Sequence, residues 1–226
     1  MEVDNALNAL LAQVEPGRSE QMAAYHKQNR VVLGVPNPAM NDLSKQWRRE
    51  LPLEDRIGLA VGLWQTDIFE ARITAAKLFT QARIRPDEAV WDVLISWLPD
   101  FDSWAIADHA ATAIQKRLVA DPSRLDVVEG WTTSDHMWTR RAALVATLPW
   151  TKQNHPSKEE MAARDRILSW AATYVEDQQW FIQKAVAWWL RDLSKHDPER
   201  TRAFIEIHGD RMKPFARKEA IRHLIP

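Results

Sequence analysis

The chain contains no cysteine among its 226 residues. This absence excludes disulfides, thiol nucleophiles, iron–sulfur clusters and cysteine-based zinc sites, and it fits the reducing cytoplasm, where we expect the protein to act. Glycine is scarce as well, and the 12 prolines form no biased tract, which excludes collagen-like and disordered classes. No apolar run approaches about 18 residues and no basic and apolar leader opens the chain, so the sequence predicts neither a membrane span nor a signal peptide.

Net charge is also nearly absent, because 30 lysines and arginines oppose 31 acidic residues. Bulk charge therefore does not single out nucleic acid or membrane as a partner. The distribution is uneven, however, since residues 181–226 hold ten basic residues against six acidic ones. A nearly neutral chain can thus still carry a basic face.

Several common catalytic motifs are missing. There is no P-loop, glycine-rich dinucleotide turn, His-Glu-x-x-His or Gly-x-Ser-x-Gly sequence. The seven histidines are scattered, and neighbours such as Asp108 and His109 point in different directions on a helix. We therefore expect no metal and no cofactor.

Hydrophobic periodicity predicts an all-α protein. Apolar residues recur every three or four positions, and no stretch alternates long enough for a strand. Helix starts are marked by Arg85-Pro86 and by cap-forming residues such as Asp67 and Ser157. No composition break divides residues 1–226, so a single domain is expected. The twelve to thirteen predicted helices lie near 4–14, 19–29, 38–50, 53–65, 68–82, 86–98, 103–119, 122–130, 135–148, 158–174, 178–195, 198–207 and 213–224.

Aromatic residues near the predicted helix starts recur at a nearly constant interval. Phe69, Trp104, Trp138, Trp180 and Phe215 are separated by 35, 34, 42 and 35 residues. The longer interval contains a polar loop that we interpret as an insertion of about seven residues. Helix pairs at this period are typical of α-solenoids of HEAT or TPR size. Because the TPR pattern is absent, the sequence favours HEAT-like repeats with a concave groove.

Tryptophan is abundant, at 12 residues, and one of these lies on a basic helix face. On the predicted helix 178–195, Trp188 falls within about 60° of Lys184, Arg191 and Lys195. A stripe of cations and aromatics suits a polyanion with flat or sugar surfaces, so these three cations are candidates for binding such a polyanion. The alternative is that Trp188 merely packs against the next repeat. The opposite side of this helix carries the predicted core residues Ile182, Ala185, Trp189 and Leu193.

A second tryptophan lies beside a carboxylate. Trp104 and Asp108 are one turn apart on the predicted helix 103–119, on the side opposite the core residues Ile106 and Ala110. The pattern indicates a carboxylate next to an aromatic wall. The alternative is a surface carboxylate beside a partly buried tryptophan.

An arginine interrupts an apolar row on the predicted helix 135–148. Arg141 shares a face with Leu144 and Leu148, where it is costly unless a carboxylate or a phosphate pairs with it. An intramolecular salt bridge would explain it equally well. We expect the neighbouring Arg140 to be solvated.

These features coincide with the motifs of a known family. The sequence resembles the AlkD-type DNA glycosylases, HEAT-like-repeat enzymes that remove cationic alkylated purines, over about residues 22–224. The chain lacks two residues common in that family, an acidic residue directly after Trp104 and an arginine in the loop that follows Gly34. The resemblance is carried by Met22-Ala-Ala-Tyr25, Leu33-Gly34-Val35, Ser103-Trp104 with Asp108, Met137-Trp138-Thr-Arg140-Arg141-Ala-Ala143, Trp180-Phe-Ile-Gln-Lys184-Ala-Val-Ala-Trp188-Trp-Leu-Arg191, and Arg217-Lys218-Glu-Ala-Ile-Arg222-His.

The resemblance implies roles for five residues. Asp108 would be the catalytic carboxylate, and Trp104 and Trp188 would wall the lesion nucleotide. Arg141 would hold a backbone phosphate, and Tyr25 would lie near the site. The resemblance also implies an open groove in which aromatic walls contact the deoxyribose.

One carboxylate suffices for this chemistry. An N3- or N7-alkylated purine already carries positive charge, so it leaves as a neutral base without a general acid. An anion can then stabilise the oxocarbenium-like sugar. We therefore expect a monomeric base-excision glycosylase acting on double-stranded DNA with alkylated purines. The alternatives are a non-catalytic HEAT-like protein that binds distorted or branched DNA, and a solenoid that binds proteins.

Overall fold

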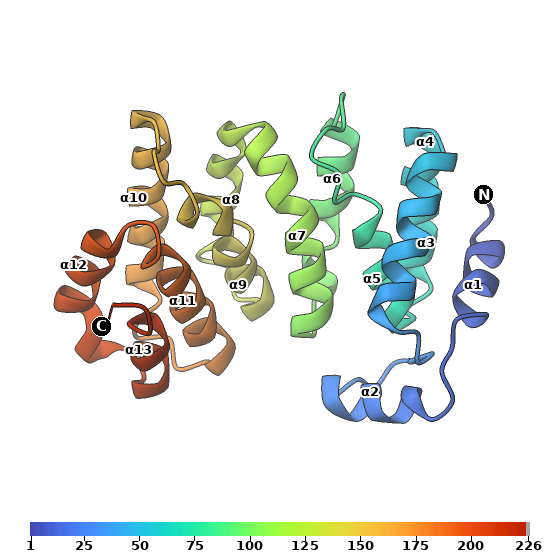
Figure 1. Ribbon diagram of the computed structural model, residues 1–226, viewed down its shortest axis with the longest axis horizontal. Helices are drawn as coiled ribbons and strands as arrows, with labels where there is room; N and C mark the ends of the chain where they lie inside the picture. Colours follow the sequence, from blue (N-terminus) through green and yellow to red (C-terminus); the bar gives the residue numbers. More distant parts are fainter. Residues whose placement is uncertain (225–226) are drawn as a thin grey trace. The chain divides into compact units, whose positions relative to one another are not determined.

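The computed structural model describes residues 1–224, and within this range every regular element is a helix (Figure 1). This confirms the all-α prediction, and each of the thirteen expected helices has a counterpart. The largest difference lies at the end of α5, which stops at Lys77 instead of residue 82. Among the described residues, no helix is long and apolar enough to cross a membrane.

The chain forms two compact units, residues 1–120 and residues 121–226. In the first unit α3, α5 and α7 pack side by side in one layer (Figure 1). The other layer is formed by α1, α4 and α6, with α4 packed on α5 and α6 on α7. The helices of this unit are α1 (Val3–Leu11), α2 (Arg18–His26), α3 (Asn37–Glu50), α4 (Leu53–Gln65), α5 (Phe69–Lys77), α6 (Glu88–Ser96) and α7 (Trp104–Ala120).

The second unit repeats this arrangement. Helices α9, α11 and α13 pack side by side, while α8 packs on α9 and α10 contacts both α9 and α12. Three-residue and four-residue 3₁₀ turns precede or follow several of these helices. The helices are α8 (Leu125–Trp131), α9 (Met137–Val145), α10 (Lys158–Thr173), α11 (Trp180–Leu193), α12 (Pro198–His208) and α13 (Pro214–Ala220).

The predicted aromatic period marks the starts of five helices, which belong to the layer of α3, α5 and α7 or to the layer of α9, α11 and α13. Phe69, Trp104 and Trp180 are the first residues of α5, α7 and α11. Trp138 and Phe215 are the second residues of α9 and α13. The period thus corresponds to one pair of helices, as expected for helical repeats.

The longer interval contains a loop that a buried arginine fixes. Arg164 of α10 is almost fully buried and donates from Nε to the Trp150 carbonyl at 3.0 Å and from Nη2 to the Gln153 carbonyl at 2.9 Å. Its Nη1 also pairs with Asp197 at 3.0 Å, at the start of α12. The segment that lengthens the repeat is therefore tied to two helices.

Of the two predicted helix caps, one is confirmed and one is wrong. Ser157 caps α10 in a capping box, in which its hydroxyl accepts from the Glu160 amide and the Glu160 carboxylate accepts from the Ser157 amide. Asp67 was wrong as a cap, because it has a left-handed φ of 55° and instead pairs with Arg72 at 3.1 Å. The Arg85-Pro86 peptide is cis and precedes α6, which begins at Glu88.

Most of the tryptophans form the core. Nine of the twelve indoles are buried, and one pair, Trp64 and Trp97, stacks with ring centres 4.1 Å apart. The three exceptions are Trp104, Trp180 and Trp188, each of which lies on α7 or α11. The core positions predicted on α7 and α11 are confirmed, because Ile106, Ala110, Ile182, Ala185, Trp189 and Leu193 are all buried.

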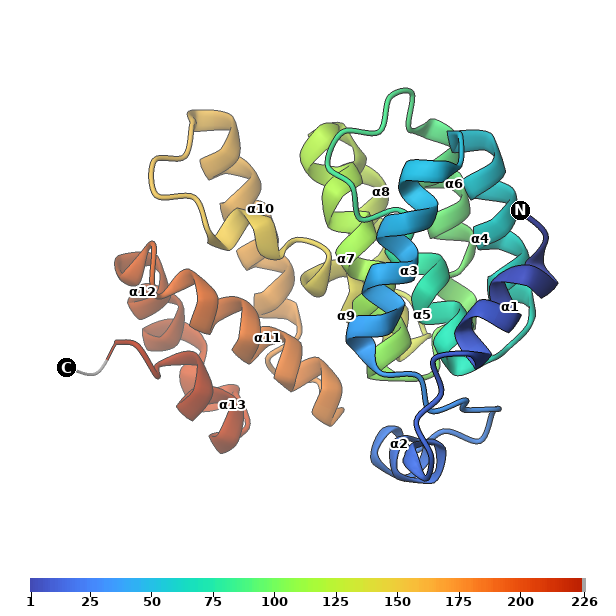
Figure 2. The same cartoon turned by 45° about the vertical axis from the view of Figure 1, so that its right-hand side comes forward.

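A buried carboxylate holds the loop between α2 and α3. Glu70 of α5 accepts hydrogen bonds from the backbone amides of Leu33 at 2.9 Å, Gly34 at 2.7 Å and Val35 at 3.2 Å. Gly34 has a φ of 91°, and a Cβ there would lie 2.8 Å from the Ser19 amide nitrogen, so only glycine fits. These contacts position α2, which lies apart from the two layers of its unit (Figure 2).

Candidate functional site

The Trp104–Asp108 pair lies on one face of α7, as its spacing predicts. Both side chains are half-buried, whereas Ala105, Ile106 and Ala107 between them are buried in the unit. The wheel-based prediction that this pair points away from the core is therefore confirmed. A carboxylate here is both accessible and adjacent to an indole.

Helix α2 adds aromatic rings to this face. Tyr25 meets Trp104 edge-on with ring centres 6.0 Å apart, and its side chain is 71% exposed. His26 lies between Trp104, at 4.9 Å, and Phe69, at 4.8 Å. Burial lowers the pKa of the His26 imidazole, so the ring is neutral at physiological pH. The family resemblance implied that Tyr25 lies near the site, and this role stays a prediction, although its ring contacts Trp104. His26 was not predicted.

The predicted basic stripe of α11 is exposed or half-exposed along its length. Lys184 lies over the ring of Trp180, with Nζ 4.7 Å from the ring centre, and Trp180 is 49% exposed. Trp188 is half-buried, and its Nε1 donates to Asp192 Oδ2 at 3.2 Å. The sequence analysis identified Trp180 only as one of the periodic aromatic residues. Its position one turn before Lys184 could have indicated the cation–π contact.

A carboxylate inside this stripe was overlooked. Asp192 is one turn after Trp188, and it pairs with Arg191 at 3.2 Å and lies 3.9 Å from Lys195. Arg191 also pairs with Glu219 of α13. The stripe is therefore less positive than its three cations suggest, because two of them are already neighbours of carboxylates.

Arg141 is integrated into the packing of the second unit. Its side chain is only 4% exposed, its Nη1 donates to the Phe181 carbonyl at 2.8 Å, and its guanidinium lies 5.8 Å from the Phe181 ring centre. These contacts join α9 to the start of α11. They supply part of the hydrogen bonding that offsets the cost of burying a guanidinium in an apolar row. The phosphate contact of Arg141 stays a prediction.

The expectation that Arg140 is solvated was wrong. Its Nη1 donates to the carbonyl of Ser134 at 2.6 Å, and its Nη2 pairs with Asp177 at 3.1 Å. The hydroxyl of Tyr174 donates to the Arg140 carbonyl at 3.0 Å. Arg140 thus ties the loop before α9 to the loop before α11.

The predicted site residues form two groups. Tyr25, Trp104 and Asp108 belong to the first unit, whereas Arg141 and the α11 stripe belong to the second. Convergence of both groups on one concave surface stays a prediction, as does the single-domain assignment. Across residues 1–224, no three histidine, aspartate or glutamate side chains gather as a metal site would require.

Comparison with known families concerns the chain as a whole. The family model for DNA alkylation repair enzymes matches residues 6–224, which is nearly the whole chain. The chain belongs to this family. No protein of curated function matches the sequence significantly.

Solved structures of related fold agree with the family. A predicted DNA alkylation repair enzyme from Enterococcus faecalis is 23% identical with a TM-score of 0.78, covering 94% of this chain and 97% of that one. AlkD2 from Streptococcus mutans is 19% identical with a TM-score of 0.65, and the match covers 100% of both chains. At these identities the likeness concerns the fold.

A third structure belongs to a family described as related to the HEAT-like repeat DNA glycosylases, with affinity for branched DNA structures. It is 16% identical with a TM-score of 0.72, covering 99% of this chain and 94% of that one. This protein of the DNA alkylation repair family therefore has the HEAT-like repeat fold that its aromatic period predicts.

Proposed function

We propose that this protein is a DNA glycosylase that excises N3- or N7-alkylated purines from double-stranded DNA. The observation that carries the proposal is the pairing of Asp108 with Trp104 on α7, beside the exposed ring of Tyr25. Membership of the DNA alkylation repair family supports it.

Cleavage of the glycosidic bond requires only one correctly placed negative charge from the protein. The alkylated base is already cationic, so cleavage of its glycosidic bond releases a neutral base and leaves positive charge on the deoxyribose. Asp108 stabilises this charge and orients the water that attacks the sugar. The indole of Trp104 forms an apolar wall that excludes bulk water from one side of the sugar and strengthens the field of the carboxylate.

In this proposal the second unit binds the DNA backbone. Lys184 presents its ammonium on an exposed indole, a combination that accepts both a phosphate and the flat face of a sugar or base. Trp188 supplies a second wall, and Arg141, Arg191 and Lys195 contribute phosphate contacts. Because Arg191 and Lys195 lie beside Asp192, Lys184 contributes more to binding than either.

A second candidate function is non-catalytic binding of branched DNA. It is favoured by the structural relative with affinity for branched DNA structures, which covers almost all of this chain. That function needs the basic contacts but has no use for a carboxylate beside an aromatic wall. The two candidates therefore differ in what they require of Asp108.

Base release from duplex DNA containing 7-methylguanine tests the proposal. We expect the wild-type protein to release the base, and Asp108→Asn to lower the single-turnover rate by ~10²–10³, which corresponds to about 3–4 kcal/mol. Binding of the variant to undamaged duplex should stay equal or tighten, because the carboxylate repels phosphates.

Asp92→Asn provides a matched control, since Asp92 is exposed on α6 in the other layer of the same unit. It should leave both rate and binding unchanged. If the wild-type protein releases no base but binds a four-way junction more tightly than duplex, the branched-DNA function is the correct one. Normal base release by a folded Asp108→Asn variant would show that the carboxylate has no catalytic role.

A further inference from the structure

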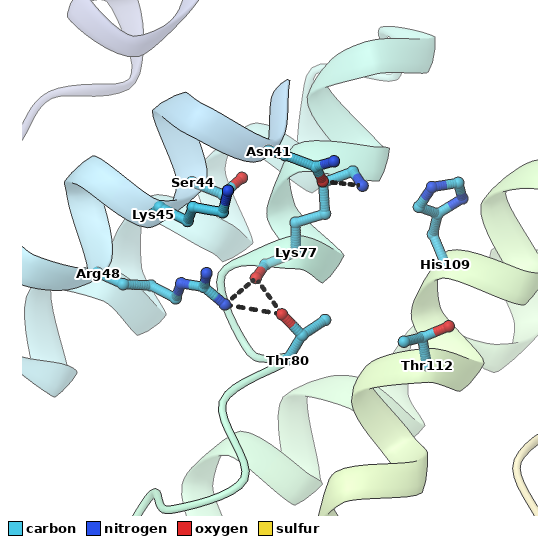
Figure 3. A pocket seen from close by; sticks show the side chains of 8 residues that line it. All are labelled: Asn41, Ser44, Lys45, Arg48, Lys77, Thr80, His109 and Thr112. Carbon is cyan, nitrogen blue, oxygen red and sulfur yellow. Dashed lines mark hydrogen bonds between the residues drawn. The ribbon is translucent and has the colours of Figure 1, made fainter. Parts of the chain in front are cut away.

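A basic cavity of about 210 Å³ lies within the first unit, between α3, α5 and α7. Figure 3 shows Lys45 and Arg48 extending from α3, Lys77 at the end of α5, Thr80 in the segment that follows α5, and His109 on α7 across from them. The volume corresponds to roughly seven water molecules. The cavity lining is completed by Asn41, Ser44 and Thr112.

Two cations of this cavity, Arg48 and Lys77, have neutral partners. Lys77 is 9% exposed, and its Nζ donates to Asn41 Oδ1 at 2.6 Å. Arg48 donates from Nη1 to Thr80 Oγ1 at 2.8 Å and to the Lys77 carbonyl at 3.4 Å. Within residues 1–224, neither of these two cations forms an ion pair.

This arrangement is costly without an anion. Buried cations lose hydration, and ordinarily a carboxylate compensates them. Burial, and after it the charge of Arg48, lowers the pKa of Lys77 to about 8. Lys45, at the mouth of the cavity, pairs only with the exposed Asp42 at 3.3 Å. His109 adds no charge at neutral pH, because burial and the nearby Lys77 lower its pKa to about 4.

We infer that the cavity formed by Lys45, Arg48 and Lys77 is a seat for a phosphate group of the DNA backbone. A phosphate would supply the missing negative charge and accept hydrogen bonds from two or three cationic donors. An ordinary carboxylate-bearing ligand would fill the charge requirement less fully. The choice of DNA as the source of the phosphate rests on the proposed function.

The position of the cavity on α7 supports a backbone phosphate. His109 directly follows Asp108, and the Thr112 hydroxyl donates to the Asp108 carbonyl at 2.8 Å. The cavity therefore lies along the same helix as the proposed catalytic carboxylate and within about one turn of it. A phosphate held there would fix the position of the sugar–phosphate chain relative to Asp108, independently of any contact made by the second unit.

The test measures binding of an undamaged, fluorescein-labelled duplex across a series of salt concentrations. Lys77→Met and Lys45→Gln should each weaken binding and lower the slope of log K against log salt by about one unit. Lys45 is exposed, so its variant keeps the fold even if Lys77→Met is destabilised. Arg49→Gln is the matched control, because Arg49 is exposed on the same helix, outside the cavity, and should leave the slope unchanged.

A second arm distinguishes a backbone phosphate from free phosphate. Thermal unfolding is followed with inorganic phosphate and with chloride at equal ionic strength, for the wild type and Lys77→Met. Selective stabilisation of the wild type by phosphate, together with the reduced duplex slopes, supports the seat. If phosphate stabilises the wild type but both variants keep the wild-type duplex slope, the occupant is a free phosphate and the inference is overturned. Equal slope losses in Arg49→Gln would also overturn it, because they would indicate a diffuse field.

This outcome is separable from that of the glycosylase proposal. Base release by Asp108→Asn reports on catalysis, whereas the duplex slopes of the cavity variants report on the phosphate seat. If the wild-type protein releases no base but the Lys45→Gln and Lys77→Met variants have reduced slopes, the phosphate seat is supported and the glycosylase proposal is refuted. Base release that depends on Asp108, with unchanged slopes, gives the opposite result.

Discussion

Glu70→Gln tests how the first unit positions its aromatic face. The Glu70 carboxylate is fully buried, and both of its oxygens accept backbone amides, Oε1 from Gly34 and Val35 and Oε2 from Leu33. Glutamine has the same shape but only one acceptor oxygen. If that oxygen keeps the two bonds of Oε1, the NH₂ group faces the Leu33 amide, and two donors are left opposed.

The expected cost follows from this count. One hydrogen bond to a charged group is lost, a buried donor stays unsatisfied, and the two remaining bonds become neutral, which together amounts to about 2–4 kcal/mol. Much of the loss should be local, because the three amides lie in the loop that carries α2 toward α3. The Tyr25 ring, which meets Trp104 from α2, should become more mobile.

Urea unfolding and amide hydrogen exchange provide the two readouts. We expect a lower free energy of unfolding and faster exchange at Leu33, Gly34 and Val35, with exchange in the second unit unchanged. Glu88→Gln, an exposed glutamate of α6, should change stability by less than about 0.5 kcal/mol. Unaltered exchange at these three amides in Glu70→Gln would refute the assignment of Glu70 as the anchor of the loop.

Two further predictions concern histidine titration and helix capping. Burial and the neighbouring Lys77 lower the pKa of His109 to about 4, so the unfolded chain binds more protons between about pH 4 and 6.5, and stability should fall by about 3 kcal/mol as pH drops through that window. Histidine titration by NMR should locate this midpoint, and His109→Gln should flatten the pH dependence of unfolding; a midpoint near 6.5 would contradict it. Ser157→Ala removes the α10 capping box and should cost about 1 kcal/mol in urea unfolding, against no loss for the exposed Ser169→Ala.

Periodicity predicted the fold because packing follows it directly. The aromatic residues that begin α5, α7, α9, α11 and α13 recur at the interval of one helix pair, and apolar spacing located each helix. Boundaries were less accurate where side chains compete for the ends. Asp67, for example, resembles a cap in sequence but pairs with arginines that are distant in the chain or lie later in α5.

The angular positions of residues on the predicted helices indicated which side chains lie outside the core, but not which groups those side chains contact. They placed Trp104, Asp108 and Trp188 outside the core, and these side chains are indeed half-buried. They gave no indication of the Glu70 anchor or the Lys77 cavity, because both depend on contacts between residues 29 to 37 positions apart. Asp192 could have been found, since it is one turn from Trp188 on the same helix.

The placement of acidic residues decides where this chain attracts a polyanion. Sequence composition points to the C-terminal 46 residues, where basic residues outnumber acidic ones by ten to six. In the structure, however, Arg191 pairs with Asp192 and Glu219, while Arg211 and Arg217 pair with Glu176 and Asp210. Such pairs reduce the field that a phosphate would meet.

The cavity of the first unit has the opposite character. Residues 1–120 hold 16 acidic residues against 13 basic ones, yet Arg48 and Lys77 share a partly enclosed space with neutral partners. A cation without a carboxylate neighbour and with little hydration gains more from a phosphate than one already paired at the surface. We therefore expect Lys77→Met to lower duplex affinity more than Arg191→Ala, and the reverse order would indicate that the α11 stripe dominates binding.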